Sequence, residues 1–308
     1  MNLFSSTVLR RSYLPKMNLT MMKSKPSLKN LTKSALLHLS LLTLFISGCS
    51  CPKEPTYKEK EIPLIVRKIC KDEYGLNVTT QRIGNTLWIY APVDKILHKD
   101  YGKDQNKIFD EKMVEKLRNI LITTGRVLIS SDDTPQFFAL LISDIVLGID
   151  YTIVGNILDI KKSYAGFIPE EESNRRYVVK FSPSPEAIGD KTGYHFIPYD
   201  ITMTDFLKEQ IAQRIAARFQ NEELKDYFKV AMSEGKFKDG IFSFEYSIEE
   251  TAKPKTKIKI RNEILRIIAY CLKTYEFDDF TIVSIKDLRT DEKLNFTKNE
   301  ILNRPTDF

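Results

Sequence analysis

The residues best suited to chemistry in this chain are aspartates that fall at the ends of expected strands. Asp132 and Asp133 stand side by side in the sequence SDDTP, between two apolar runs. Asp144, Asp150 and Asp159 also lie near strand ends, so carboxylates could gather at one edge of a sheet. Paired carboxylates suit acid–base work, and oxygen-rich clusters suit Ca²⁺ or Mg²⁺. An aspartate just before a proline is also what a tight turn requires. We expect the turn role for Asp132 and Asp133, with a binding role as the alternative.

No motif of a known catalytic or metal centre accompanies these carboxylates. His98 and His195 are the histidines of the chain after residue 48, and neither lies in an H-E-x-x-H pattern. The sequence has no G-x-S-x-G nucleophile elbow, no C-x-x-C pair and no glycine-rich phosphate loop. We therefore expect no catalytic residues, no metal and no bound cofactor.

An aromatic pair marks one expected strand as a candidate binding surface. Trp88 and Tyr90 alternate with Leu87 and Ile89, and side chains alternate between the two faces of a sheet. Both aromatic rings therefore share a face, which could bind peptidoglycan sugars or a protein partner. Packing in the protein core is the ordinary outcome for such residues.

A different chemistry is indicated where a short apolar run ends at Cys49. Ile46, Ser47 and Gly48 precede the cysteine directly, and a lysine-containing stretch precedes the apolar run 35–47. The 13 residues of that run are too few to span a bilayer, which takes about 20, but they suit a cleaved signal peptide. This segment resembles the signal peptide and lipobox of bacterial lipoproteins.

The resemblance implies a covalent anchor and an address. In bacterial lipoproteins the cysteine receives a diacylglyceryl group, a peptidase cuts before it, and the new amino group is acylated. Cys49 would thus become a lipidated first residue, because two or three acyl chains anchor a protein stably. Ser50, where aspartate would favour the inner membrane, implies the periplasmic face of the outer membrane. An ordinary secretory signal with a chance cysteine is the alternative.

The targeting segment also accounts for the positive charge of the chain, which is formally +6. Residues 1–48 hold seven basic side chains and no acidic one, which leaves 40 basic against 41 acidic residues. A nearly neutral mature protein has no field to attract nucleic acid. We expect a signal peptide over 1–48, with 1–20 as a candidate mis-assigned start, and a polar tether over 49–61.

The remaining cysteines do not form a disulfide framework. Cys51 falls in the tether, and Cys70 and Cys271 sit in apolar helical patterns. We expect both thiols to pack in the core, with a single Cys70–Cys271 disulfide in an oxidising compartment as the alternative.

Hydrophobic periodicity predicts an alternation of helices and strands over the rest of the chain. Helices are expected at 62–75, 109–125, 202–219 and 259–277, and residues 221–232 are expected to continue the third helix or form another. Strands are expected at 76–83, 86–93, 126–130, 136–145, 151–160, 176–182, 239–248 and 278–288, with a hairpin turn at Gly84-Asn85.

These elements predict an α+β fold, a mostly antiparallel sheet with packed helices. The order strand, charged loop, amphipathic helix, strand occurs over 86–130 and again over 239–288. The repeat suggests two related β-α-β units, although α+β domains often contain this order without duplication. The expected division is an α+β domain over 62–233 and a smaller α+β domain, or a continuation, over 234–308.

Taken together, the sequence indicates a lipid-anchored protein of the cell envelope that acts by binding or assembly rather than catalysis. The expected partners are the membrane, through the lipid on Cys49, and another envelope protein or peptidoglycan. Nucleic acid is not expected. An envelope hydrolase that uses the aspartates, and a glycan- or small-ligand-binding lipoprotein with its site near Trp88, are the alternatives.

Overall fold

The computed structural model describes residues 57–101, 108–254 and 258–306. The signal peptide, the lipobox residues Ile46, Ser47 and Gly48, the lipidation site Cys49, and Cys51 lie outside these ranges, so the anchor stays a prediction. In the ranges that are described, no helix is long and apolar enough to cross a bilayer.

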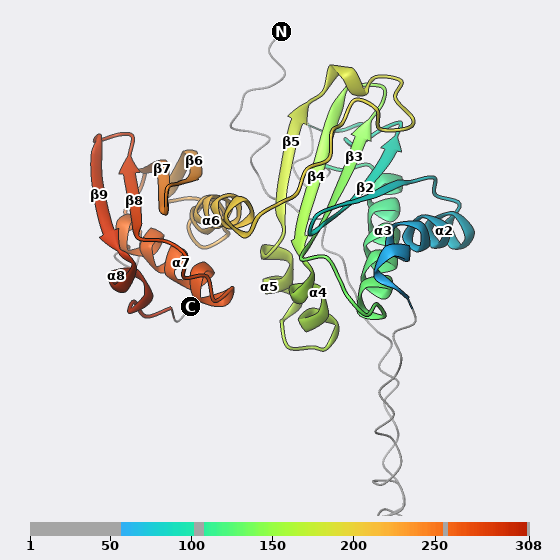
Figure 1. Cartoon of the computed structure of the whole chain (residues 1–308). Helices are drawn as coiled ribbons and strands as arrows, with labels where there is room; N and C mark the ends of the chain where they lie inside the picture. Colours follow the sequence, from blue (N-terminus) through green and yellow to red (C-terminus); the bar gives the residue numbers. More distant parts are fainter. Residues whose placement is uncertain (1–56, 102–107, 255–257, 307–308) are drawn as a thin grey trace, which may run out of the picture.

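The first half of the chain forms a five-stranded sheet with two helices on one face (Figure 1). Its strands, in spatial order, are β1 (Thr79–Ile83), β2 (Thr86–Val93), β3 (Phe137–Asp144), β4 (Ile149–Asn156) and β5 (Val178–Pro183). The helices are η1 (Glu59–Glu61), α2 (Ile62–Tyr74), α3 (Glu111–Ile129), α4 (Ile157–Tyr164) and α5 (Glu170–Arg175), and η2 (Pro185–Ala187) follows β5. Only β2 and β3 are parallel, because α3 carries the chain across between them.

The second half of the chain forms a four-stranded sheet, again with its helices on one face. The strands in spatial order are β6 (Phe228–Lys238), β7 (Ile241–Glu250), β8 (Ile282–Asp287) and β9 (Glu292–Thr297). The helices are α6 (Met203–Phe219), α7 (Ile260–Thr274) and α8 (Lys298–Leu302). Here β7 and β8 are the parallel pair, and α7 makes the crossover.

The two halves share one topology. Each runs helix, antiparallel hairpin, crossover helix, antiparallel hairpin, helix, and each places its one parallel pair in the same position of the sheet. The first unit adds α5 and β5 after that common set. The predicted α+β class with mostly antiparallel pairing is confirmed, and the strand–helix–strand order occurs twice, as β2-α3-β3 and β7-α7-β8. α6 and the start of β6 precede residue 234 and belong to the second unit.

Turns and caps set several element boundaries. Gly84 adopts a φ of +53° in the two-residue link between β1 and β2, a conformation that costs glycine little. Asp110 accepts two backbone N–H bonds at the start of α3. Thr202 and Asp205 form a reciprocal capping box at the start of α6. These short-range signals fix where the hairpin and the two helices begin.

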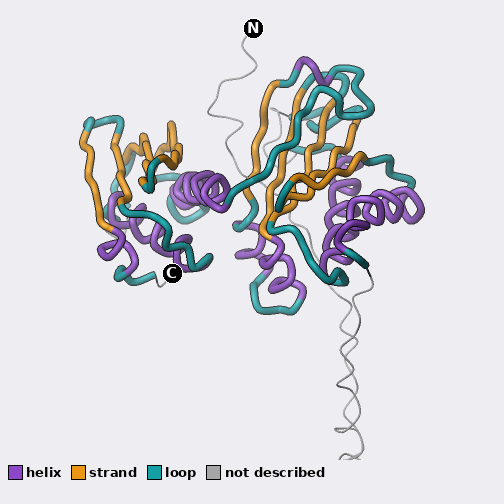
Figure 2. The backbone as a smooth tube through the Cα atoms, viewed as in Figure 1, coloured by secondary structure: helices purple, strands orange, loops and turns teal. Residues whose placement is uncertain are grey.

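Helix α6 lies between the two sheets and is buried on two sides (Figure 2). Leu207, Ile211 and Ile215 belong to the apolar core of the second unit. Phe206 belongs to an apolar cluster on the first sheet, where its ring centroid lies 5.2 Å from that of Phe137. One helix therefore serves both units and fixes the second against the first.

Polar contacts join the units beside α4 and α5. Glu172 accepts hydrogen bonds from Arg214 of α6 (2.6 Å), Tyr270 of α7 (2.7 Å) and Arg176 (2.9 Å). Arg176 also pairs with Asp159 at 2.6 Å. Burial alone would raise the pKa of Glu172, but Arg214, Tyr270 and Arg176 hold that pKa below its ordinary value. The junction is thus an ion-pair network whose carboxylate stays charged.

The strand predicted over 151–160 ends at Asn156, because α4 begins at Ile157, and two further predicted segments differ in the structure. Residues 126–130 are not a strand, because α3 continues to Ile129 and buries Val127 and Leu128 on its core face. Gly125 does not stop that helix. A Cβ at this position would lie 2.9 Å from the Tyr164 ring, so this glycine permits close packing. The other segment is the stretch 221–232, which is not helical: turns lead to Phe228, where β6 begins.

The cysteine alternatives are also resolved. Cys70 is buried in the core of the first unit and Cys271 in that of the second, and both are free thiols, so the alternative of a disulfide between them was wrong. Burial raises the pKa of each thiol to about 11. Both cysteines therefore act as small core residues, as predicted.

Candidate functional site

Residues 184–201, which we call the strap, cross the face of the first sheet opposite α2 and α3 (Figure 1). Side chains of β1 and β2 tie the strap to the sheet along its length. Trp88 Nε1 donates to Tyr199 O (2.6 Å), Tyr90 Oη donates to the backbone carbonyl of Asp190 (2.6 Å), and Thr79 Oγ1 donates to the carbonyl of Thr192 (3.0 Å). At the end of the strap, Thr86 Oγ1 donates to the Asp200 carboxylate (3.1 Å) and accepts the backbone N–H of Ile201 (2.8 Å). A long segment with almost no secondary structure is thus held in place by side chains of β1 and β2.

Trp88 and Tyr90 share a face, as the alternation predicts, and the strap covers it. Their exposed fractions are 4% and 5%. The Trp88 ring packs against Phe196 and Tyr199 of the strap, with centroids 4.6 Å and 5.4 Å away. The two side chains therefore hold the strap and are not an open platform for stacking.

A buried histidine flanked by two carboxylates holds the middle of the strap. His195 Nδ1 lies 2.8 Å from Asp190 Oδ2, and its Nε2 lies 3.4 Å from Asp150 Oδ2 on β4. Burial would raise the pKa of Asp190, but bonds from the backbone and ring of His195 and from Thr192 lower it well below its usual range. Ser143 Oγ donates to Asp150 (2.5 Å) and not to the imidazole, so this serine is not paired with His195 as a nucleophile with its base.

Of the five aspartates that were expected to gather at one sheet edge, Asp144 and Asp150 share one end of the sheet but lie on opposite faces, and the other three are elsewhere. Asp132 and Asp133 precede β3 in an exposed turn, where the Asp132 carboxylate accepts the backbone N–H of Asp133 (2.7 Å). Asp144 ends the same strand and caps loop backbone at the opposite end. Asp159 pairs with Arg176 at the unit junction. Of the five, Asp150 alone reaches the strap, so these residues supply no carboxylate pair for a hydrolase.

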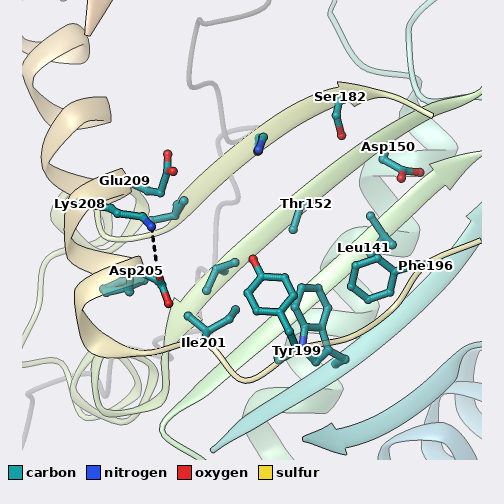
Figure 3. Close-up of a pocket in the computed structure, with 15 residues that line it drawn as sticks. Leu141, Asp150, Thr152, Ser182, Phe196, Tyr199, Ile201, Asp205, Lys208 and Glu209 are labelled. Atoms are coloured by element: carbon teal, nitrogen blue, oxygen red, sulfur yellow. Dashed lines mark hydrogen bonds and ion pairs between the residues drawn. The ribbon is translucent and has the colours of Figure 1, made fainter. Parts of the chain in front are cut away.

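Beside the strap, the same face of the sheet forms one side of a cavity of about 470 Å³, which we call the strap groove (Figure 3). The floor is made by β3, β4 and β5, one wall by Phe196, Tyr199 and Ile201 of the strap, and the other by the first half of α6. A volume of this size is in the lower part of the range found for small-molecule sites.

Helix α6 is fixed as a wall of the groove by contacts with the edge of the sheet. The side-chain amide of Gln213 donates to the carbonyl of Val179 (2.7 Å) and accepts its N–H (3.0 Å), so it pairs with β5 as a neighbouring strand would. Glu209 lies one helical turn before Gln213, and Lys180 follows Val179. Both Glu209 of α6 and Lys180 of β5 line the groove.

The charged groups of the groove fall into two classes. Asp205 and Lys208 pair at 2.7 Å (Figure 3). Burial would raise the pKa of Asp205, but its bonds from Lys208 and Thr202 lower it. Lys180 and Glu209 line the groove without an ion-pair partner anywhere in the described chain, and they do not pair with each other. One cation and one anion are thus available to a ligand.

Sequence reasoning singled out Trp88, Tyr90 and Asp150 but none of the wall residues. The strap wall could have been recognised from its aromatic residues, because Tyr194, Phe196 and Tyr199 lie in one loop.

Within residues 57–101, 108–254 and 258–306, no group of three or more His, Cys, Asp or Glu side chains could hold a metal ion. No family model, curated protein or solved structure matches the chain.

Proposed function

We propose that this chain is a lipid-anchored protein of the bacterial cell envelope that acts by binding, with the strap groove as its binding site. The observation that carries the binding role is the groove itself: the sheet, the strap and α6 line it, its walls are tied down by hydrogen bonds, and two of its charges are unpaired. A preformed cavity with a few convergent polar groups is the usual form of a ligand site.

The lipobox resemblance at Cys49 supports the anchor, and the short tether supports a body that works close to the bilayer. Tyr57 is the first described residue, and it pairs with Ser131 at the base of the first unit. Residues 49–56 can span at most about 29 Å. The first unit would therefore start near the lipid, on the periplasmic side of the outer membrane, where an envelope protein or peptidoglycan can reach it.

The anchor is tested by substituting Cys49 and following labelled palmitate. In the full chain expressed in a double-membrane bacterium, we expect the wild type and Cys51→Ser to take up label and to sediment with outer membrane. Cys51→Ser is the matched control because it removes a thiol two residues away. We expect Cys49→Ser to lose both properties. Label or normal processing that persists in Cys49→Ser would rule out the lipid anchor.

A further inference from the structure

We infer that the strap groove binds a zwitterionic, peptide-like ligand: a short peptide with a free amino group, a free carboxylate and an apolar side chain. The inference rests on the proposed binding role and adds the chemical class of the ligand. Lys180 would pair with the carboxylate of the ligand and Glu209 with its ammonium group. Both side chains reach solvent, so each can exchange water for a ligand group.

The interior of the groove suits the remainder of such a ligand. Val154, Val178 and Phe206 form an apolar end that can take an aliphatic side chain. Thr152 and Ser182 line the floor, and their hydroxyl groups have no protein hydrogen-bond partner among the described residues. A peptide bond carries one donor and one acceptor, and two such hydroxyl groups can satisfy both.

Charge complementarity separates this ligand from other classes. An uncharged sugar would cover Lys180 and Glu209 without pairing either, and burying an unpaired charge is unfavourable. A polyanion would meet three carboxylates in the lining, those of Asp150, Asp205 and Glu209. A zwitterion leaves neither charge unpaired, so it fits the groove best.

The groove contains its own optical reporter. Trp88 is the only tryptophan of the chain, it lines the groove, and it touches two further wall residues, Phe196 and Tyr199. We would titrate the mature lipoprotein, purified in detergent, with leucyl-leucine and follow Trp88 emission. The blocked control is N-acetyl-leucyl-leucine amide, which has the same side chains and no charges. We expect saturable binding of the free dipeptide and at least tenfold weaker binding of the blocked one.

Matched substitutions locate the site. Lys180→Met and Glu209→Gln should each weaken leucyl-leucine binding about tenfold, because each removes one charge-assisted contact. Lys162→Met and Glu170→Gln make the same changes at exposed positions on α4 and α5 and should leave binding unchanged. Circular dichroism confirms that each variant is folded.

Each remaining outcome decides the question. Three outcomes would overturn the inference. The blocked dipeptide could bind as tightly as the free one, the control substitutions could weaken binding as much as Lys180→Met and Glu209→Gln, or leucyl-leucine could give no saturable response. Binding of a neutral N-acetylhexosamine disaccharide in place of the dipeptide would also overturn it, yet would keep the proposed binding function. Dipeptide binding by a protein that takes up no palmitate would support the ligand class while refuting the lipid anchor.

Discussion

Glu172 and Glu171 are neighbours on α5 with opposite surroundings. Glu172 receives Arg214, Arg176 and Tyr270 at the unit junction, whereas Glu171 meets only Arg175 in solvent. Replacing Glu172 by alanine leaves two largely buried guanidinium groups without their shared carboxylate, and we expect a loss of about 3 kcal/mol in the free energy of unfolding. Glu171→Ala should cost less than about 0.5 kcal/mol. Urea denaturation measures both, and equal losses would contradict the network.

Asp190 makes the free energy of unfolding depend on pH in the acidic range. Its pKa in the folded protein lies below the ordinary value of 3.8, so the unfolded chain binds a proton first as the pH falls. The stabilising contribution is complete above that ordinary value and is lost as the pH drops through the folded pKa. The difference in unfolding free energy between wild type and Asp190→Asn should therefore be largest at neutral pH and should shrink below about pH 4. A difference that does not change with pH would contradict this role.

At the scale of elements, the strap depends on a glycine that lies against an aromatic ring. Gly193 has a φ of +87°, and a Cβ there would come 2.9 Å from the Tyr90 ring. Gly189 has a similar φ of +75° but open space around it. Gly189→Ala should therefore cost about 1 kcal/mol for the backbone alone. Gly193→Ala should cost at least about 2 kcal/mol, because the ring must also move.

Thermal unfolding and Trp88 emission test the comparison between the two glycines. The strap covers Trp88, so a displaced strap should expose its ring and shift the emission to longer wavelength. We expect that shift in Gly193→Ala and not in Gly189→Ala. Identical spectra and identical stability losses would show that contact with Tyr90 does not hold the strap.

The elements that sequence could predict are those whose signals are local. The hairpin at Gly84-Asn85 and the start of the helix predicted over 202–219 depend on neighbouring residues alone, and both are found as predicted. The strand predicted over 126–130 failed because Gly125 resembled a helix stop. Gly125 instead permits close packing against the Tyr164 ring, which is distant in sequence and comes close only in the folded protein.

The candidate site was less predictable for the same reason. The face shared by Trp88 and Tyr90 followed from alternation, but its cover did not, because a strap of irregular backbone has no periodicity to read. Asp150 and His195 meet across 45 positions of sequence, and Lys180 and Glu209 line one groove because Gln213 pairs α6 with the edge strand. Long-range pairing of this kind leaves no pattern in a single sequence.

At the scale of the whole molecule, two units of one topology are joined so that α6 belongs to both. The faces that pack helices are equivalent in the two units, but the opposite faces differ. The first sheet carries the apolar cluster around Trp88 and Phe137, covered by the strap and α6, whereas the second presents Ser243 and Lys286 there. The groove therefore exists in one unit only, and its wall is contributed by the other, so the site requires both units in place.

This dependence predicts that the units unfold together. Phe206 is 2% exposed and contacts Phe137 of the first unit and Tyr275 of the second. In urea, Trp88 emission reports the first unit and far-ultraviolet circular dichroism both, and their midpoints should coincide in the wild type. Phe206→Ala should cost about 3 kcal/mol and separate the midpoints, because it weakens the junction. Phe219→Ala, a similar loss inside the second core, should lower both midpoints together. Separate midpoints in the wild type would show that the units are independent.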